Sequence, residues 1–388
     1  MLHTFAVANY RSLRDIKLAL APLTIITGAN GSGKSNLYRA LLLLQHAARG
    51  DLAEALALQG GIASAQWAGP ADIRSQAKRG VAIQGGGRNA PLRVTFGFGS
   101  DDFAYEIALG LPGQTKETRE NSMFTLDPEV KAEAIWQKPP RRRSNTWLER
   151  EGGRVGLRDR DDKWVTLAYS APANRSILAD LGEPERFPEV FALRERMRRW
   201  RFYDGFRTDV ESALRHPRVS VQTDALAHDG RDVAAALQTI REIGEGAVLD
   251  NAIADAFEGA TLEIINAGDA RLQIGLLLEG LLRPLTAMEL SDGTLRYLCL
   301  LAALMSPRPP ELLVLNEPEQ SLHPDLLRPL AKQIVAASAH SQVWVISHAP
   351  KLVADLEDAA GIVAVELERE FGETSIKGQR LLDEPVWP

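Results

Sequence analysis

A glycine-rich stretch near the N-terminus constrains this chain more than any other feature. Residues 28–35 read GANGSGKS, which fits the GxxxxGK[ST] pattern of a phosphate-binding loop. An apolar run at 23–27 precedes the loop, and a helix-like stretch at 37–48 follows it. A Gly/Ser-rich turn is the alternative interpretation, but this strand–loop–helix context is the one that the motif requires. The sequence therefore predicts an α/β fold with a nucleoside triphosphate site.

The loop also predicts which residues contact the nucleotide. Glycines let successive backbone N–H groups turn towards phosphate oxygens, with a helix N-terminus behind them. Lys34 is expected to reach the β- and γ-phosphates, and the Ser35 hydroxyl is expected to bind Mg²⁺. The nucleotide-binding residues expected from this segment are Asn30, Gly31, Ser32, Gly33, Lys34, Ser35 and Asn36.

Three later segments place polar residues beside apolar runs. They read ELSDGT at 289–294, LLVLNEP at 312–318 and VWVISH at 343–348. Alone, each has an ordinary explanation: a turn or helix cap, a solvated acidic loop, and a structural histidine. The intervals between them each accommodate about one helix and one strand, as in a mostly parallel sheet. Their polar ends would then gather at the carboxyl ends of the strands, where such sheets bind ligands.

In this order, the four segments resemble the phosphate loop, signature motif, Walker B strand and switch histidine of ABC-type ATPases. The resemblance implies a P-loop NTPase of the α/β class: an ABC-type ATPase head with an antiparallel β region and a helical lobe. It further implies that Glu317 polarises the attacking water and that His348 contacts the γ-phosphate. Residues Ser291, Asp292 and Gly293 would close over the γ-phosphate bound to a partner subunit.

Longer matches narrow the resemblance to the SMC, RecF and OLD-like group. The opening, FAVANYRS at 5–12 with a second strand at 16–20, looks like the first hairpin of these ATPases, and Arg11 in it is expected to contact the nucleotide. The runs ELSDGTLRY at 289–297, LNEPEQSLHP at 315–324 and WRFYD at 200–204 are similar to bacterial standalone AAA ATPases of that group. The resemblance is strongest over 1–50 and 285–350.

The resemblance implies an ATPase that uses ATP and Mg²⁺ and forms a homodimer around ATP. OLD nucleases carry a Toprim domain after the ATPase, and the 40 residues after His348 are too few for one, so no nuclease domain is expected. No heptad pattern predicts the coiled coil of SMC proteins. The sequence does not indicate which residue serves as the Q-loop glutamine.

One position departs from the broader ABC pattern. Asn316 stands where an aspartate usually coordinates Mg²⁺ through water, and a neutral amide oxygen binds a hard cation more weakly. One account is a slow ATPase in which Asn316→Asp raises the rate or lowers the Mg²⁺ requirement. The other account is that a nearby residue such as Glu319 supplies the missing charge, and then the aspartate variant would crowd two carboxylates.

Composition predicts a soluble, cytoplasmic protein without a membrane partner. No apolar stretch reaches the roughly 18–20 residues of a membrane span, and the N-terminus lacks the layout of a signal peptide. The single cysteine, Cys299, excludes an internal disulfide and a CxxC zinc site. Its apolar surroundings predict a small buried hydrophobe.

Arginine clusters bear on the client of the ATPase, although the net charge of the chain is −6. Residues 141–143 are three consecutive arginines, and the segment 191–207 mixes six arginines with aromatic residues in an apparently helical pattern. Such a mixture can hold a nucleic-acid backbone, or it can be a solvated helix paired with nearby glutamates. Two functions therefore stay open: action on DNA, in repair or in defence against phage or plasmid DNA, and an ATP-gated switch controlling an unidentified protein partner.

Patterning also predicts a domain organisation. We expect an ATPase core from 1–70 and 286–388, a β-rich part at 71–170 and a mainly helical lobe at 171–285. Alternating residues predict hairpins at 92–98 with 103–111 and at 362–368 with 374–377, and further edge strands near 131–137, 146–149 and 164–168. Strands are also expected at 261–265 and 272–278. From 174 to 257 the pattern is helical.

Overall fold

The computed structural model describes residues 1–69, 92–113, 123–124, 126–138, 140–159, 162–380 and 383–387. The chain forms two compact units. The first comprises Met1–Ala21, Gly28–Arg199 and Glu366–Pro388, and the second comprises Pro22–Thr27 and Trp200–Val365. Each unit is described separately below.

An eight-stranded antiparallel sheet organises the first unit. Its strands, in spatial order, are β2 (Leu13–Ala19), β1 (Leu2–Tyr10), β4 (Val94–Ser100), β5 (Ala104–Gly110), β6 (Glu129–Trp136), β7 (Thr146–Glu151), β8 (Arg154–Arg158) and β9 (Trp164–Ser170). The predicted hairpin β4–β5 is confirmed, with Phe96 opposite Ile107, and so is the opening hairpin β1–β2. The edge assignment was wrong for β6 and β7, because each of them has a hydrogen-bonded neighbour on both sides.

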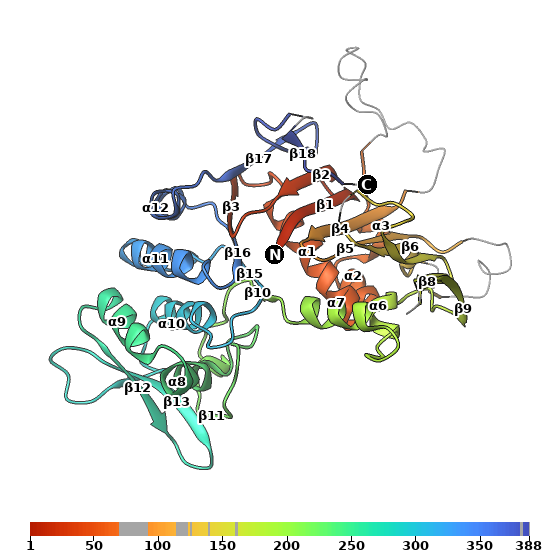
Figure 1. Ribbon diagram of the computed structural model, residues 1–388. Helices are drawn as coiled ribbons and strands as arrows, with labels where there is room; N and C mark the ends of the chain where they lie inside the picture. The colour runs from red at the N-terminus through yellow and green to blue at the C-terminus, as the bar shows by residue number, and fades with distance from the viewer. Residues whose placement is uncertain are drawn as a thin grey trace. The chain divides into compact units, whose positions relative to one another are not determined.

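Helices gather on this unit around α1 (Lys34–Arg49), as Figure 1 shows. The others are α2 (Leu52–Leu58), α3 (Gly61–Ala65), α6 (Ile177–Asp180) and α7 (Pro188–Arg198). Helix α1 buries Leu37, Leu41 and Leu44, whose spacing of four and three residues places them on one face. The predicted C-terminal hairpin is also confirmed as β17 (Val365–Glu370) and β18 (Glu373–Ile376), in antiparallel pairing.

A parallel sheet organises the second unit. Four strands lie in the order β10 (Arg201–Tyr203), β15 (Leu312–Asn316), β16 (Gln342–Ile346) and β3 (Leu23–Gly28, of which 23–27 belong to this unit). In Figure 1, helices α10 (Asp292–Leu304), α11 (Leu327–Ala337) and α12 (Pro350–Ala360) stand in a row beside these strands. The strands are almost wholly buried, as their continuous apolar sequences require.

The register brings the carboxyl ends of these four strands to one edge. Tyr203 lies opposite Leu315, Asn316 opposite Ile346, and Ile346 opposite Ile26. The polar residues that follow each strand therefore start from the same edge of the sheet, as the spacing of the sequence motifs predicted.

The remaining elements of the second unit form a small sheet with two helices. They are β11 (Arg218–Val219), β12 (Thr261–Asn266), β13 (Arg271–Leu277), β14 (Leu285–Thr286), α8 (Val233–Ile243) and α9 (Gly246–Ala256), with short 3₁₀ turns at Ala213–Arg215 and Pro324–Leu326. The strand predictions at 261–265 and 272–278 are confirmed.

The helical prediction for 174–257 was wrong between α7 and α8. Residues 200–232 contain strand β10, a 3₁₀ turn and the short strand β11 in place of α-helix. Phe202 and Tyr203 are buried because β10 pairs with β15 in the parallel sheet. This pairing with a strand more than a hundred residues away overrides the local pattern.

Candidate nucleotide site

Two glycines allow the phosphate loop to form in the first unit. Gly33 caps the start of α1 with a φ of 112°, and a Cβ atom there would lie 2.2 Å from Thr374 Oγ1. Gly28 has a φ of 147°, and a Cβ atom there would lie 2.4 Å from the Leu367 carbonyl oxygen. The glycines of the motif thus permit both the backbone turn and the close approach of the β17–β18 hairpin.

The chemistry of the loop fits an anion. The Lys34 ammonium donates hydrogen bonds to the carbonyls of Gly28 (2.6 Å) and Ala29 (3.0 Å), so it lies within the loop. The Ser32 hydroxyl is buried, with no hydrogen-bond partner among the described residues. Helix α1 has neither a side-chain cap nor an acidic residue in its first turn, so the positive end of its dipole is uncompensated. A phosphate group supplies the negative charge and the acceptors that these groups need.

Residues outside the motif brace the loop. Thr374 Oγ1 lies 2.7 Å from the Ser32 carbonyl oxygen and 2.8 Å from Ser12 Oγ. The Asn36 amide donates to the same Ser12 oxygen over 2.9 Å, so this side chain ties α1 to the β1–β2 turn. Ser12 and Thr374 were not among the predicted site residues. Only Ser12 carried a signal, since it ends the FAVANYRS run at 5–12.

Arg11 lies on the same turn with a φ of 48°. Its guanidinium donates to the Gln59 carbonyl over 3.3 Å and lies 5.5 Å from the centre of the Tyr10 ring. A contact between Arg11 and a nucleotide stays a prediction.

The Walker B strand of the second unit ends in a strained residue. Glu317 has a φ of 50°, a left-handed conformation that is uncommon outside glycine, and its N–H donates to the Ile346 carbonyl over 2.7 Å. His348 Nδ1 lies 3.4 Å from Glu317 Oε1. The structure therefore brings together the two residues that the sequence predicted to act at the γ-phosphate. Backbone strain is common at functional sites, where the surrounding structure holds it.

Glu319 holds the switch loop in place. Its Oε1 accepts hydrogen bonds from the Ser347 hydroxyl (2.7 Å) and from the N–H groups of His348 (3.1 Å) and Ala349 (3.2 Å). The side chain is buried, and its Oε2 has no partner among the described residues. The three hydrogen bonds to Oε1 do not favour Glu319 as the source of the charge that Asn316 lacks.

Asn316 has a different carboxylate beside it. Its Nδ2 donates to Asp204 Oδ1 over 2.7 Å. Asp204 follows β10 directly and ends the WRFYD run. The sequence showed this run but did not indicate that its aspartate pairs with Asn316. The pair joins residues 112 positions apart.

The signature segment forms a capped helix start. Ser291 caps α10: its hydroxyl oxygen accepts a hydrogen bond from the Thr294 N–H over 3.1 Å. A helix cap was the ordinary explanation of this segment in the sequence. A Cβ atom at Gly293 would lie 2.8 Å from the Ser321 carbonyl oxygen, so this glycine allows α10 to approach the loop after β15. Arg296 strengthens that approach by donating to the Gln320 carbonyl (3.2 Å).

Arg215 organises the segment before α10. This buried side chain donates to the carbonyls of Thr208, Ala287 and Leu290 over 2.7, 2.8 and 2.9 Å, and to Asp292 Oδ1 over 2.6 Å. The sequence did not indicate this role of Arg215, because its partners are backbone carbonyls, which residues of every type carry. The Asp292 carboxylate thus has a partner within its own subunit, and its predicted role across a dimer is untested.

Charges near the signature are similarly paired. Hydrogen bonds from the Arg283 guanidinium and from Thr286 lower the pKa of Glu289 to about 2. Burial raises the pKa of the Cys299 thiol, in agreement with the predicted role of Cys299 as a small buried hydrophobe.

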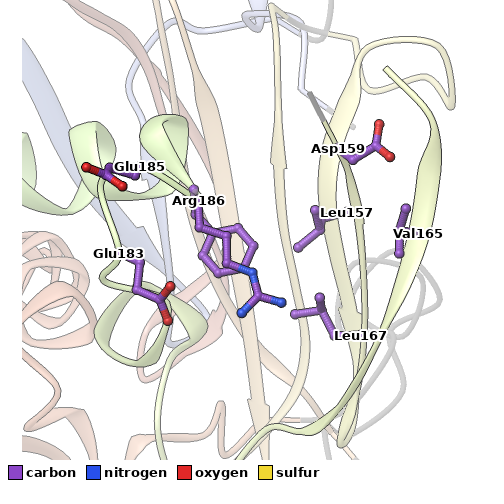
Figure 2. Close-up of a pocket in the computed structure, with 8 residues that line it drawn as sticks. Leu157, Asp159, Val165, Leu167, Glu183, Glu185 and Arg186 are labelled. Carbon is purple, nitrogen blue, oxygen red and sulfur yellow. The ribbon is translucent and has the colours of Figure 1, made fainter. Parts of the chain in front are cut away.

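Two hollows of the first unit are separate from these motifs. One cavity of about 540 Å³ lies between β8, β9 and residues 183–187. Figure 2 shows Arg186 between Glu183 and the apolar residues Leu157 and Leu167. No residue of the nucleotide motifs lines it.

The arginines of α7 are engaged with nearby acidic or aromatic side chains. Arg194 and Arg198 both contact Glu195 (3.2 and 3.3 Å), and Arg196 contacts Asp102 (3.0 Å). This pairing supports the solvated amphipathic helix of the two alternatives. Arg201 lies outside the helix, on β10.

Residues 141–143 differ, because they line a pocket of about 560 Å³ with Trp164. Arg141 pairs with Glu149 over 2.7 Å, while no ion pair is found for Arg142 or Arg143 among the described residues. Two exposed guanidinium groups and an aromatic ring thus share one hollow.

The described part of the chain lacks two further features. None of its helices is both long and apolar enough to cross a bilayer. Within the same residues, no group of three or more His, Cys, Asp or Glu side chains is arranged to hold a metal by itself.

Comparison with known proteins gives a family for this chain. A family model described as "AAA domain, putative AbiEii toxin, Type IV TA system" matches residues 23–354. An "OLD nuclease" of Thermus scotoductus is 50% identical over 44 residues, which are 11% of this chain and only 8% of that nuclease.

Solved structures show a similar fold at low sequence identity. An SMC head bound to the C-terminal winged-helix domain of ScpA aligns with a TM-score of 0.50 and 13% identity, covering 98% of both chains. An SMC head domain from Thermotoga maritima aligns with a TM-score of 0.42 and 15% identity, covering 98% of this chain and 99% of that one. The first of these alignments shows the mixed α/β fold of an SMC-type ATPase head, and the antiparallel sheet of the first unit belongs to it. Since the family model spans most of its length, the chain belongs to this family of AAA-domain ATPases.

Proposed function

We propose that this protein binds and hydrolyses ATP with Mg²⁺ and that ATP drives its dimerisation. The observation that carries the proposal is the pair formed by Glu317 and His348. Glu317 is held at a φ of 50° with its carboxylate 3.4 Å from His348 Nδ1, at the carboxyl edge of the parallel sheet. A carboxylate in that place can orient and polarise a water for attack on a γ-phosphate.

Three groups of residues would act together: those that bind phosphate, those that hold Mg²⁺, and the histidine that contacts the γ-phosphate. The loop amides and Lys34 would bind the β- and γ-phosphates, and Ser35 and Asn316 are proposed to hold Mg²⁺. Bound there, the ion would neutralise the charge that develops on the transferred phosphoryl group. His348, on the loop held by Glu319, would report the presence of the γ-phosphate to that loop.

Dimerisation follows from the chemistry of the signature. Ser291 and Gly293 open α10 at its positive end, which suits an anion. The region has no reaction of its own, so we propose that it closes over a γ-phosphate bound to a second copy of the chain.

Dimerisation has a direct test in a form that retains ATP. Glu317→Gln with Mg·ATP is expected to run as a dimer by light scattering, and adding Ser291→Arg is expected to return it to a monomer. Because arginine removes the helix cap, Ser291→Asp serves as a matched variant: it keeps the cap but repels phosphate. A dimer that persists without ATP and in both variants would contradict the proposal.

For the client we favour DNA. The family description names a putative toxin of a Type IV toxin–antitoxin system, and the 44-residue match is to a nuclease, so a role in defence against foreign DNA is our proposal. The alternative, a slow ATP-gated switch acting on a partner protein, is supported by the acidic net charge of −6.

Because the arginines of α7 are paired with acids, we propose that Arg142 and Arg143 contact DNA in their place. Arg142→Gln with Arg143→Gln is expected to weaken binding of a single-stranded oligonucleotide and to flatten its salt dependence, because fewer counterions are released. Trp164→Ala should weaken binding further by removing a stacking surface, by about 1–3 kcal/mol. Fluorescence anisotropy across a salt series measures both effects.

A matched control comes from α7. Arg194→Gln with Arg198→Gln removes the same charge from a helix whose arginines are already paired, and it should change binding less. Equal losses from both pairs would contradict a site at 142–143, and a larger loss from the α7 pair would return the DNA site to α7. No binding by wild type at low salt, with or without ATP, would favour the partner-protein alternative.

A further inference from the structure

Asp204 occupies a rigid position at the active edge of the parallel sheet. It directly follows β10, and buried Tyr203 and Phe206 flank it with ring centres 5.7 Å apart. The Tyr203 hydroxyl donates to the Leu226 carbonyl over 2.8 Å, and His228 Nδ1 lies 2.6 Å from the Phe202 carbonyl oxygen. These contacts hold the end of β10, so the exposed Asp204 carboxylate projects from a fixed backbone.

The sheet register places this carboxylate beside the Walker B asparagine. Tyr203 lies opposite Leu315 in the parallel pair β10–β15, so the next residues, Asp204 and Asn316, are neighbours. Their side chains meet at 2.7 Å. An ionised carboxylate can only accept hydrogen bonds, so the amide must present its Nδ2 to Asp204. The Asn316 Oδ1 is then left to accept from another donor.

The pairing of Asp204 with Asn316 provides the negative charge that the Walker B motif lacks. Mg²⁺ keeps several waters and is typically held by one or two carboxylates together with substrate phosphates. Asn316 alone offers a neutral oxygen. The hydrogen-bonded pair of Asn316 and Asp204 offers that oxygen together with one full negative charge, which is the charge of a single aspartate.

We propose that Asp204 supplies the negative charge of the Walker B site and orients Asn316 towards the water shell of Mg²⁺. The proposal rests on the proposed Mg·ATP site and adds a residue to it. Asp204 acts through Asn316 and is therefore a positioning residue. Two other acids lie near: Glu317 is against His348, and Glu319 holds the His348 loop through Oε1 and has no partner for Oε2 among the described residues. The carboxylate that is hydrogen-bonded to Asn316 is that of Asp204.

A charge exchange between the two positions tests the proposal. Asp204→Asn removes the charge, and Asn316→Asp places two carboxylates in contact. The double variant Asp204→Asn/Asn316→Asp restores one charge and one hydrogen-bonded pair, with the aspartate at the usual Walker B position. We expect Asp204→Asn to lose about 10- to 100-fold in apparent Mg²⁺ affinity, as is typical when a partner of a metal ligand is removed. Asn316→Asp is expected to break the hydrogen-bonded pair, because two facing carboxylates repel each other and offer no donor. The double variant should recover most of the affinity that Asp204→Asn loses.

Binding of a fluorescent ATP analogue, titrated with Mg²⁺ and repeated in EDTA, gives a readout that does not depend on turnover. Affinity in EDTA should be the same in all four proteins, because the phosphate loop is intact. Asp209→Asn is the control, since Asp209 is an exposed acid five residues along that pairs with Arg207. Melting temperatures check that each variant folds.

The outcomes separate this inference from the proposed function. If wild type binds no nucleotide, the proposed function fails. If wild type binds nucleotide with Mg²⁺ but Asp204→Asn leaves the Mg²⁺ titration unchanged, Asp204 has no such role. A double variant no better than Asp204→Asn would also overturn the inference, because a charge at position 316 would then not replace the charge at position 204.

Discussion

Replacing Lys34 with alanine is expected to abolish the stabilisation of the protein by ATP. The ammonium lies within the phosphate loop, 2.6 Å from the Gly28 carbonyl oxygen, and is the cation expected to meet the γ-phosphate. A ligand that binds only the folded state at 100 times its Kd stabilises that state by about 2.7 kcal/mol. Thermal unfolding with and without Mg·ATP should show this shift for wild type and none for Lys34→Ala.

The control for this variant is another lysine of the same unit. Lys377 is exposed and pairs with Glu366 over 2.7 Å, so Lys377→Ala removes the same group far along the chain from the loop. It should keep the full ATP shift. Equal ATP shifts in Lys34→Ala and wild type would show that the nucleotide site is elsewhere.

Replacing Glu317 with glutamine is expected to stop hydrolysis while leaving ATP binding intact. Glutamine has nearly the same shape, so the strained backbone and the contact with His348 can persist, but it cannot polarise a water as a carboxylate does. Positioned general bases contribute about 10²- to 10⁴-fold, so a loss in that range is expected in steady-state phosphate release. The ATP-induced shift in melting temperature should match that of wild type.

Two comparisons sharpen the result. Glu242→Gln changes an exposed glutamate on α8 and should leave the rate unchanged. Glu319→Gln should loosen the His348 loop, because its Oε1 accepts three hydrogen bonds there, and should lower the rate less specifically. A Glu317→Gln protein with near wild-type turnover would remove Glu317 from the chemistry.

Much of the site could be predicted from the sequence because its motifs are local. The strand, the glycines and the helix start of 23–37 are consecutive, and the same is true of the Ser291 cap and of the polar residues after β15 and β16. Parallel strands end at one edge of a sheet, so the order and spacing of these segments also predicted that Glu317 and His348 would meet. Alternation predicted most antiparallel strands for a similar reason, since a half-buried strand repeats every two residues.

The tertiary structure decided which distant side chains act as partners. Asp204 meets Asn316 across 112 positions only because β10 is a strand in the parallel sheet, where the local pattern predicted helix. Arg215 holds carbonyls more than 70 positions away, and an arginine of α7 pairs with Asp102, which is 94 positions from it. The sequence by itself determined the phosphate loop and identified the groups that we propose to react, since local backbone geometry needs particular residues. The charge balance around those groups was decided by the fold, because electrostatic and hydrogen-bond partners are chosen by distance in space and leave no periodic trace along the chain.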